Sequence, residues 1–217
     1  MTPYHKTRLP AMTLIDIHTH SNTATEAAIY NCDTRYIAER KISTGIHPWH
    51  INDQWKEDFA MVAEFAKARN VVAIGECGLD TLKSTAPPEL QEDVFRAHAL
   101  LAEELCKPLI IHCVKAYDRL IALHREIRPT QAWIVHGFRG KPQLATQLIK
   151  AGFHISLGEK FNPESAKAIP TERIFIESDI SEHPITAIYT AIAAAKGMTI
   201  EELAQQTTAN SSIFKQF

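Results

Sequence analysis

The chain has 217 residues, of which 45% are hydrophobic and 22% charged, and its formal net charge is -2. This length suits one well-buried domain rather than two. The balanced charge excludes a global electrostatic attraction to nucleic acid or anionic membranes, although a bound metal ion would supply local positive charge. No apolar run approaches the roughly 20 residues that span a bilayer, and residues 1–6 lack the apolar core of a signal peptide. The four cysteines are scattered, which predicts reduced thiols in a cytoplasmic protein.

The first predicted element is an apolar strand over residues 14–20, which carries His18 and His20 at its C-terminal end. Side chains two positions apart in a strand point to the same face, so both imidazoles lie on one side. Such a pair provides half of a metal site, although a His-x-His pair alone is as often simply solvated. The rest of the chain decides between these interpretations, because later predicted strands also end in residues that bind metals.

Strands and helices alternate through the first half of the chain. A polar loop over residues 21–25 leads to a short strand at 27–32, and the next strand, at 41–46, ends at His47. A helix at 54–68 precedes a buried strand at 71–75, which ends in Glu76. A helix over 87–105 is followed by a strand at 109–111, which ends in His112, and by a helix near 117–126.

The second half continues the alternation. A strand at 132–135 ends in His136, a helix covers 142–151, and a strand covers 153–158. The last strand, at 173–176, is followed by Glu177-Ser178-Asp179, and helices near 185–195 and 200–207 finish the chain. Alternating apolar strands and amphipathic helices predict an α/β fold with a parallel sheet. The best architecture is a compact TIM-type (β/α)8 barrel that forms a single domain over residues 1–217, with one β/α unit between residues 20 and 45 reduced.

The C-terminal ends of the strands meet at one end of such a barrel, where its active site lies. Six residues that bind metals are predicted there: His18, His20, Glu76, His112, His136 and Asp179. Four imidazoles and two carboxylates suffice for two divalent ions, with one bridging carboxylate and open positions for water and substrate. Each residue alone has an ordinary explanation as a salt-bridge partner, a polar group at the sheet edge or a loop cap. Six of them at the same ends of their strands indicate a metal centre.

Several phrases of the sequence resemble the TatD family of metal-dependent hydrolases, in the amidohydrolase-like group of barrels. The phrase Gly75-Glu76-Cys77-Gly78-Leu79-Asp80 is the most specific of them. The others are residues 16–20, 45–48, 108–112, 135–140 and 177–179, with Gln91, Phe95, Asn210 and Phe214. The resemblance therefore runs over nearly the whole chain.

The resemblance implies a two-metal centre that hydrolyses phosphodiester bonds, and DNase activity is reported for several family members. One ion would be held by His18, His20 and Asp179 and the second by His112 and His136, with Glu76 as the bridge. Glu76 and Asp179 would be the catalytic carboxylates, and Asp179 would orient and deprotonate the attacking water. The metals remain open, because four histidines favour zinc or manganese whereas phosphoryl chemistry often uses magnesium. His47 is expected either to contact the substrate or to pack the barrel mouth.

Three departures from the family pattern lie on the substrate-facing side. The segment between His20 and Gly45 is short, and the usual proline-containing loop after Asp179 is missing. The usual arginine two positions after His112 is also missing, and Lys115 is the candidate replacement as a phosphate contact, although lysine lacks the bidentate geometry of arginine. Nucleic acid or a small phosphodiester is the expected substrate, with no membrane and no stable protein partner. DNA or RNA preference and oligomeric state stay open.

Three other functions remain open on the sequence. The polymerase-and-histidinol-phosphatase type of phosphoesterase shares the opening Asp-x-His-x-His-Ser, but it typically has a histidine where Ser181 stands. Hydrolysis of C–N bonds is disfavoured because no predicted strand ends in a metal-bridging lysine. A non-catalytic metal-binding barrel is the third alternative, because the substrate loops are shortened. Cys77 and Cys113 are expected to pack outward rather than bind metal.

Overall fold

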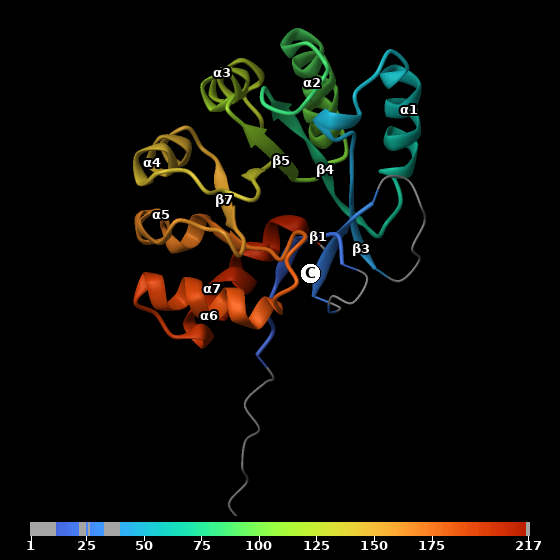
Figure 1. Cartoon of the computed structure of the whole chain (residues 1–217). Coiled ribbons are helices and arrows are strands. Elements are labelled where there is room, and N and C mark those ends of the chain that lie inside the picture. Colours follow the sequence, from blue (N-terminus) through green and yellow to red (C-terminus); the bar gives the residue numbers. More distant parts are fainter. Residues whose placement is uncertain (1–11, 22–24, 26, 33–39, 216–217) are drawn as a thin grey trace, which may run out of the picture.

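Eight parallel strands follow one another in chain order around a barrel in the computed structural model, which describes residues 12–21, 25, 27–32 and 40–215 (Figure 1). The strands are β1 (Asp16–Thr19), β2 (Ala28–Asn31), β3 (Lys41–Thr44), β4 (Val71–Asp80), β5 (Leu109–Val114), β6 (Trp133–Val135), β7 (His154–Leu157) and β8 (Ile174–Ile176). The ends of the sheet meet at one parallel bridge between Thr19 and Asp179. There the N–H of His20 donates to the Asp179 carbonyl at 3.0 Å, and the N–H of Asp179 donates to the His18 carbonyl at 2.9 Å. The predicted TIM-type barrel is confirmed.

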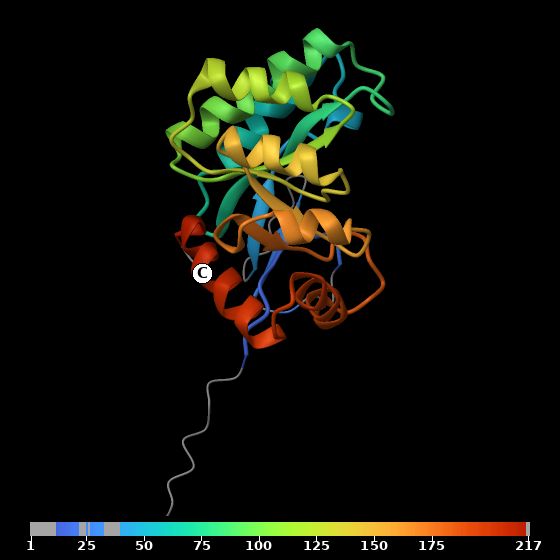
Figure 2. The same ribbon diagram turned by 90° about the vertical axis from the view of Figure 1, so that its left-hand side faces the viewer.

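Helices cover the outside of the barrel from β3 onward. They are α1 (Trp55–Phe65), α2 (Pro88–Glu104), α3 (Tyr117–Ile127), α4 (Pro142–Lys150), α5 (Pro163–Ala168), α6 (Ile185–Lys196) and α7 (Ile200–Asn210), with short 3-10 turns η1 (Pro48–His50), η2 (Thr171–Arg173) and η3 (Ser211–Phe214). Figure 2 views the molecule from the side of α3, α4, α5 and α6, and shows these four helices in front of the strands. Among the described residues no helix lies between β1 and β3, but residues 22–24, 26 and 33–39 lie outside the described part, so the reduced unit there stays a prediction. None of the described helices is long and apolar enough to cross a membrane.

Alternation along the strands sorts side chains between the barrel interior and the helices. Ile110, Ile134 and Phe175 belong to a cluster that includes no residue of α1 to α7, so they fill the barrel. Cys113 and Cys77 instead pack in the larger cluster that joins the sheet to the helices, as predicted. Because a strand has a period of two, the residues two positions after the interior side chains also face inward. This places His112, His136 and Glu177 at the mouth of the barrel.

Strand β4 is longer than the sequence predicted, since it continues past Glu76 to Asp80 and all ten of its residues are buried. Its pairing with β5 shifts in register between Ile74 and Cys77, and the Gly75–Glu76 peptide bond is cis. Beyond the shift, Gly78 lies opposite His112 with φ of 152°, and a Cβ there would stand 1.9 Å from the His112 carbonyl oxygen. Glycine at position 78 therefore permits a close approach of β4 to β5 that carries Asp80 into the barrel mouth.

Helix α5 has no counterpart among the predicted elements. The Asn162 side chain accepts hydrogen bonds from the N–H groups of Glu164 and Ser165, and Pro163 occupies the first helical position. These are ordinary helix-start signals. The helix has only six residues, which is too short to show the apolar periodicity on which helix prediction depends.

Candidate metal centre

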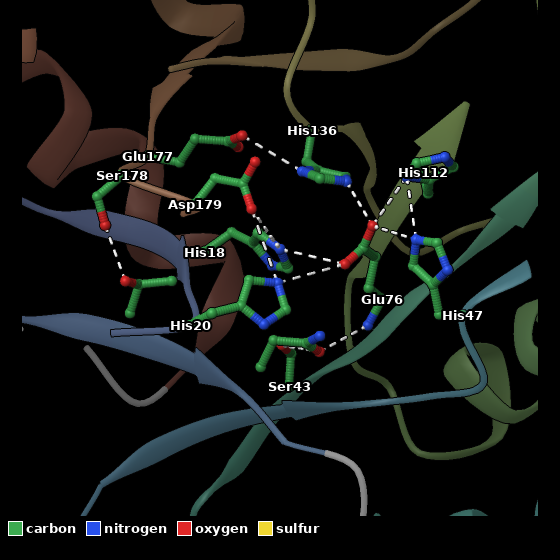
Figure 3. A network of polar contacts seen from close by, with 12 residues as sticks. His18, His20, Ser43, His47, Glu76, His112, His136, Glu177, Ser178 and Asp179 are labelled. Carbon is green, nitrogen blue, oxygen red and sulfur yellow. Dashed lines mark hydrogen bonds and ion pairs between the residues drawn. The ribbon is translucent and has the colours of Figure 1, made fainter. Parts of the chain in front are cut away.

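The carboxylate of Glu76 stands at the centre of the predicted ligands, and its two oxygens face different histidines (Figure 3). Oε1 lies 2.9 Å from Nδ1 of His112 and 2.8 Å from Nε2 of His136. Oε2 lies 3.3 Å from Nε2 of His18 and 3.7 Å from Nε2 of His20. The structure thus brings four predicted imidazole ligands, from three strands, around one carboxylate.

Asp179 is the sixth predicted ligand, and it lies at the seam, the bridge between Thr19 and Asp179 where β1 and β8 meet. Its Oδ1 lies 4.0 Å from Nε2 of His18 and 3.7 Å from Nε2 of His20. Three groups of side chains have ligand atoms within 4.8 Å of one another: His18, His20 and Asp179; His18, Glu76 and His136; and His47, Glu76 and His112. Glu76 belongs to two of these groups, which bring it close to His18 and His136 in one and to His47 and His112 in the other. All six predicted ligands therefore lie in one site.

The donor set fits divalent metal ions. His18 is fully buried, yet neither of its ring nitrogens makes a hydrogen bond with a described residue. Its Nε2 instead faces carboxylate oxygens of Glu76 and Asp179. A buried imidazole without hydrogen-bond partners is rare, whereas a metal ion between imidazole and carboxylate would satisfy both.

Strong electrostatic coupling links the histidines to the carboxylates. Burial alone would raise the pKa of Glu76, but the His136 and His112 imidazoles outweigh it and hold that pKa well below its usual range. Burial alone would lower the pKa of His136, but Glu76 and Glu177 outweigh it and raise the pKa well above the usual value. The hydrogen bond to Glu76 likewise raises the pKa of His20. Protons therefore occupy the metal-free site, and a metal that binds there must displace them.

His47 also reaches the centre, but as a hydrogen-bond donor. Its Nε2 lies 3.1 Å from Oε1 of Glu76 and 3.3 Å from Nδ1 of His112. Its Nδ1 accepts a hydrogen bond from the backbone N–H of Trp49 at 3.1 Å. A neutral imidazole that accepts at Nδ1 carries its proton on Nε2, so His47 presents N–H rather than a lone pair to the site. Burial lowers the pKa of His47, which favours this neutral form.

Two buried carboxylates to which the sequence analysis gave no role stand behind the histidines. Asp80 Oδ2 lies 3.0 Å from Nε2 of His112, and Glu177 Oε1 lies 3.3 Å from Nδ1 of His136. A signal for both was present, because Asp80 closes the most specific family phrase and Glu177 precedes Asp179 by two positions. Asp80 lies beyond the predicted end of its strand at residue 75, and at the end of the strand at 173–176 the sequence pointed to Asp179 rather than Glu177 as the ligand.

The other candidate substrate contacts are distributed around the mouth. Lys115 lines a cavity of about 460 Å³ with Leu79 and Tyr117, and none of the six candidate ligands lines it. A second cavity, of about 330 Å³, borders Asp179 and is also lined by Arg139 and Lys160. The assignment of Lys115 to substrate binding therefore stays a prediction, while the cavity at Asp179 adjoins the metal centre directly.

The comparisons with known proteins agree with this geometry. A family model described as TatD related DNase matches residues 12–215. The chain belongs to the TatD family. The uncharacterized metal-dependent hydrolase YabD of Bacillus subtilis (strain 168) is 34% identical over 188 residues, which are 77% of this chain and 74% of YabD. The 3'-5' ssDNA/RNA exonuclease TatD of Erwinia amylovora is 29% identical over 196 residues, 78% of this chain and 75% of the relative.

Solved structures share the TatD barrel. The TatD homolog YJJV of Escherichia coli superposes with a TM-score of 0.78 at 18% identity, over 93% of this chain and 97% of that protein. A TatD family hydrolase of Entamoeba histolytica gives a TM-score of 0.75 at 18% identity, over 94% and 98% of the two chains. At such low identity these neighbours establish the fold alone. The predicted membership of the TatD family of metal-dependent hydrolases is confirmed by the family match and by YabD.

Proposed function

We propose that this chain is a nuclease that hydrolyses phosphodiester bonds of single-stranded nucleic acid with two divalent metal ions. One ion would be held by His18, His20 and Asp179 and the second by His112 and His136, and Glu76 would be the carboxylate that they share. The observation that carries this proposal is the position of Glu76, whose Oε2 faces His18 and His20 while Oε1 faces His112 and His136. A donor set of four imidazoles and two carboxylates favours manganese or zinc over magnesium.

When bound, the two ions lower the pKa of a water and neutralise charge on the phosphoryl oxygens. Asp179 accepts the proton of the attacking water, and its side chain is 23% exposed at the border of the neighbouring cavity. His47 donates from Nε2 to a phosphoryl or leaving-group oxygen, because its Nδ1 is occupied by the N–H of Trp49. Glu76 stays ionised and keeps the four histidines in place through its two carboxylate oxygens.

The substrate strand lies along the cavity beside Asp179. Arg139 and Lys160 line this cavity, and neither makes an ion pair or hydrogen bond with a described residue. Glu159, which also lines it, accepts a hydrogen bond from Ser181 at 2.8 Å and lies 3.5 Å from Nε2 of His183. Two unpaired cations suit one or two phosphates of a strand end rather than a long duplex. The relative in Erwinia amylovora is named as an exonuclease on ssDNA and RNA, which fits a strand end as substrate.

We also place the enzyme in the cytoplasm. No disulfide joins its described cysteines, and Cys77 and Cys113 are buried as thiols in the apolar layer under the helices. Such cysteines suit a reducing compartment.

The test is hydrolysis by metal-stripped protein to which magnesium, manganese or zinc is added back separately. The substrates are bis(p-nitrophenyl) phosphate and a single-stranded oligonucleotide labelled at one end. We expect activity to return with metal, to shorten the oligonucleotide from an end, and to fall by at least about a thousandfold in Asp179→Asn. Two bound ions without hydrolysis of either substrate would overturn the proposal and favour another hydrolysable bond or a non-catalytic barrel.

A further inference from the structure

The carboxylate of Asp80, at the end of β4, accepts hydrogen bonds on both of its oxygens. Its Oδ1 accepts hydrogen bonds from the N–H groups of Leu82 and Lys83 at 2.8 and 2.9 Å. Its Oδ2 accepts one from Nε1 of Trp49 at 2.6 Å and lies 3.0 Å from Nε2 of His112. The side chain is 1% exposed, so the carboxylate is held by these partners alone among the described residues. The His112 contact requires a proton on Nε2, so Nδ1, which lies 2.9 Å from Oε1 of Glu76, is the ring nitrogen that a metal would take when it displaces the proton there.

Glu177 is the corresponding buried carboxylate for His136. Its side chain is 0% exposed, and its Oε1 lies 3.3 Å from Nδ1 of His136. Gly137 and Gly158 flank this carboxylate, since a Cβ on either would lie 3.5 or 3.4 Å from the nearest Glu177 side-chain atom. Glu177 thereby holds a proton on Nδ1 of His136, and Nε2, which faces Oε1 of Glu76 at 2.8 Å, is the ring nitrogen that a metal would take. The two imidazoles thus approach the same oxygen through different ring nitrogens.

We propose that Asp80 and Glu177 are positioning residues that fix His112 and His136 in opposite tautomers, so that one metal ion is bound by Nδ1 of His112 and Nε2 of His136. Both carboxylates act on the ion opposite Asp179, because His18 and His20 contact neither of them. A histidine ligand that donates its second N–H to a carboxylate is held in orientation and is a stronger base. This inference rests on the metal sites of the proposed function but not on the bond that is cleaved.

Metal binding to the full chain tests the proposal without reference to activity. Manganese is titrated by calorimetry into metal-stripped wild type, Asp80→Asn and Glu177→Gln, with circular dichroism as the check on folding. Each amide supplies an N–H₂ group where a carboxylate oxygen stood, so the hydrogen bond to its histidine weakens. We expect the affinity for one of the two ions to fall by about 10- to 100-fold in either variant, with the other ion unaffected. Asp93→Asn, which removes an exposed carboxylate from α2, is the matched control and should bind both ions as wild type does.

The second readout is the tautomer itself and needs only the wild-type chain. In zinc-loaded protein labelled with ¹⁵N at histidine, long-range ¹H–¹⁵N correlations show which ring nitrogen carries the proton. We expect the proton on Nε2 of His112 and on Nδ1 of His136. The same protonated nitrogen in both rings would overturn the proposal, as would unchanged affinities in both variants. If the tautomers are as expected and no phosphodiester is cleaved, the proposed function fails while the positioning roles stand.

Discussion

Hydrogen-bond partners decide what each histidine of the site can do. His47 receives the N–H of Trp49 on Nδ1 and is left as a donor, although its Nε2 lies as close to Glu76 as the ligands do. His18 has no hydrogen-bond partner among the described residues, which leaves both of its ring nitrogens free for the proposed metal. Identical side chains thus take different roles within a few ångströms, and the backbone and carboxylates around them make the difference.

Arg139 gives a residue-scale prediction for substrate binding. Because it is an unpaired cation in the cavity beside Asp179, replacement by glutamine should weaken one phosphate contact by about 1 kcal/mol, roughly fivefold in KM. Steady-state kinetics with a single-stranded oligonucleotide should show this rise with kcat nearly unchanged. The salt dependence of KM should also become shallower, by about 0.7 in the logarithmic slope.

The control for Arg139 is an arginine at the other end of the barrel. Arg125 lies in the last turn of α3, and Arg125→Gln should leave KM as in wild type. Hydrolysis of bis(p-nitrophenyl) phosphate, which has no second phosphate, should be equal in both variants and wild type. An Arg139→Gln enzyme that loses activity equally on both substrates would show that Arg139 supports the fold or the metal site instead.

At the scale of elements, the sequence predicted what depends on local periodicity. Alternating apolar strands predicted the barrel, and a strand end before Glu76, His112 and His136 was enough to place three candidate ligands at one mouth. The extension of β4 depends on Gly78 and its contact with β5, which no local pattern encodes. Asp80 lies on this extension and was missed with it. Glu177 stands at a predicted strand end, but its pairing with His136 was missed because the two residues lie 41 positions apart in sequence.

Helix α2 carries His98, which bonds to the backbone of Ile46 next to His47. Protonation of His98 should lower the stability of the folded protein. His98 is fully buried, its Nδ1 pairs with the Val94 carbonyl at 2.8 Å, and its Nε2 accepts the N–H of Ile46 at 2.9 Å. Burial lowers the pKa of His98 from 6.5 to about 4. His98 therefore takes up a proton near pH 6.5 in the unfolded chain, but only near pH 4 in the folded protein. The contribution of neutral His98 to the free energy of unfolding is fully present above pH 6.5. It is lost as pH falls toward 4, by about 3 kcal/mol in total.

His98→Gln removes this titration and should flatten the pH dependence of stability. Urea unfolding of metal-free protein at pH 7 and pH 4.5 gives the free energy of unfolding of each form. We expect the variant to be less stable at pH 7, because its bond to the Ile46 N–H is weakened, but to lose about 2–3 kcal/mol less than wild type on acidification. His154, whose pKa burial also lowers to about 4, is present in both proteins and cancels in the difference. An equal loss in both proteins would refute the role of His98.

For the whole molecule, the metal centre lies where the barrel is most weakly closed. Strands β1 and β8 meet at a single described bridge, whereas β4 and β5 pair at five positions. The candidate ligands His18 and His20 belong to the β1 side of this seam, and Asp179 stands three residues after the end of β8 on the other side. An ion held by these three residues would tie the first and last strands together, so we infer that metal binding and closure of the barrel are coupled.

Hydrogen exchange tests this coupling across the molecule. The reporters are the N–H groups of His20 and Asp179, which donate across the seam, and the control is helix α3, which supplies no ligand. Chelation of the metals should speed exchange in the peptides that carry the seam and leave α3 nearly unchanged. Saturation at a hundred times Kd should also stabilise the folded protein by about 2.7 kcal/mol per ion. In Asp179→Asn the seam should exchange quickly with or without metal, because the ligand on the β8 side is weakened. Equal protection of the seam in metal-free and metal-loaded protein would mean that the barrel closes through its strands alone.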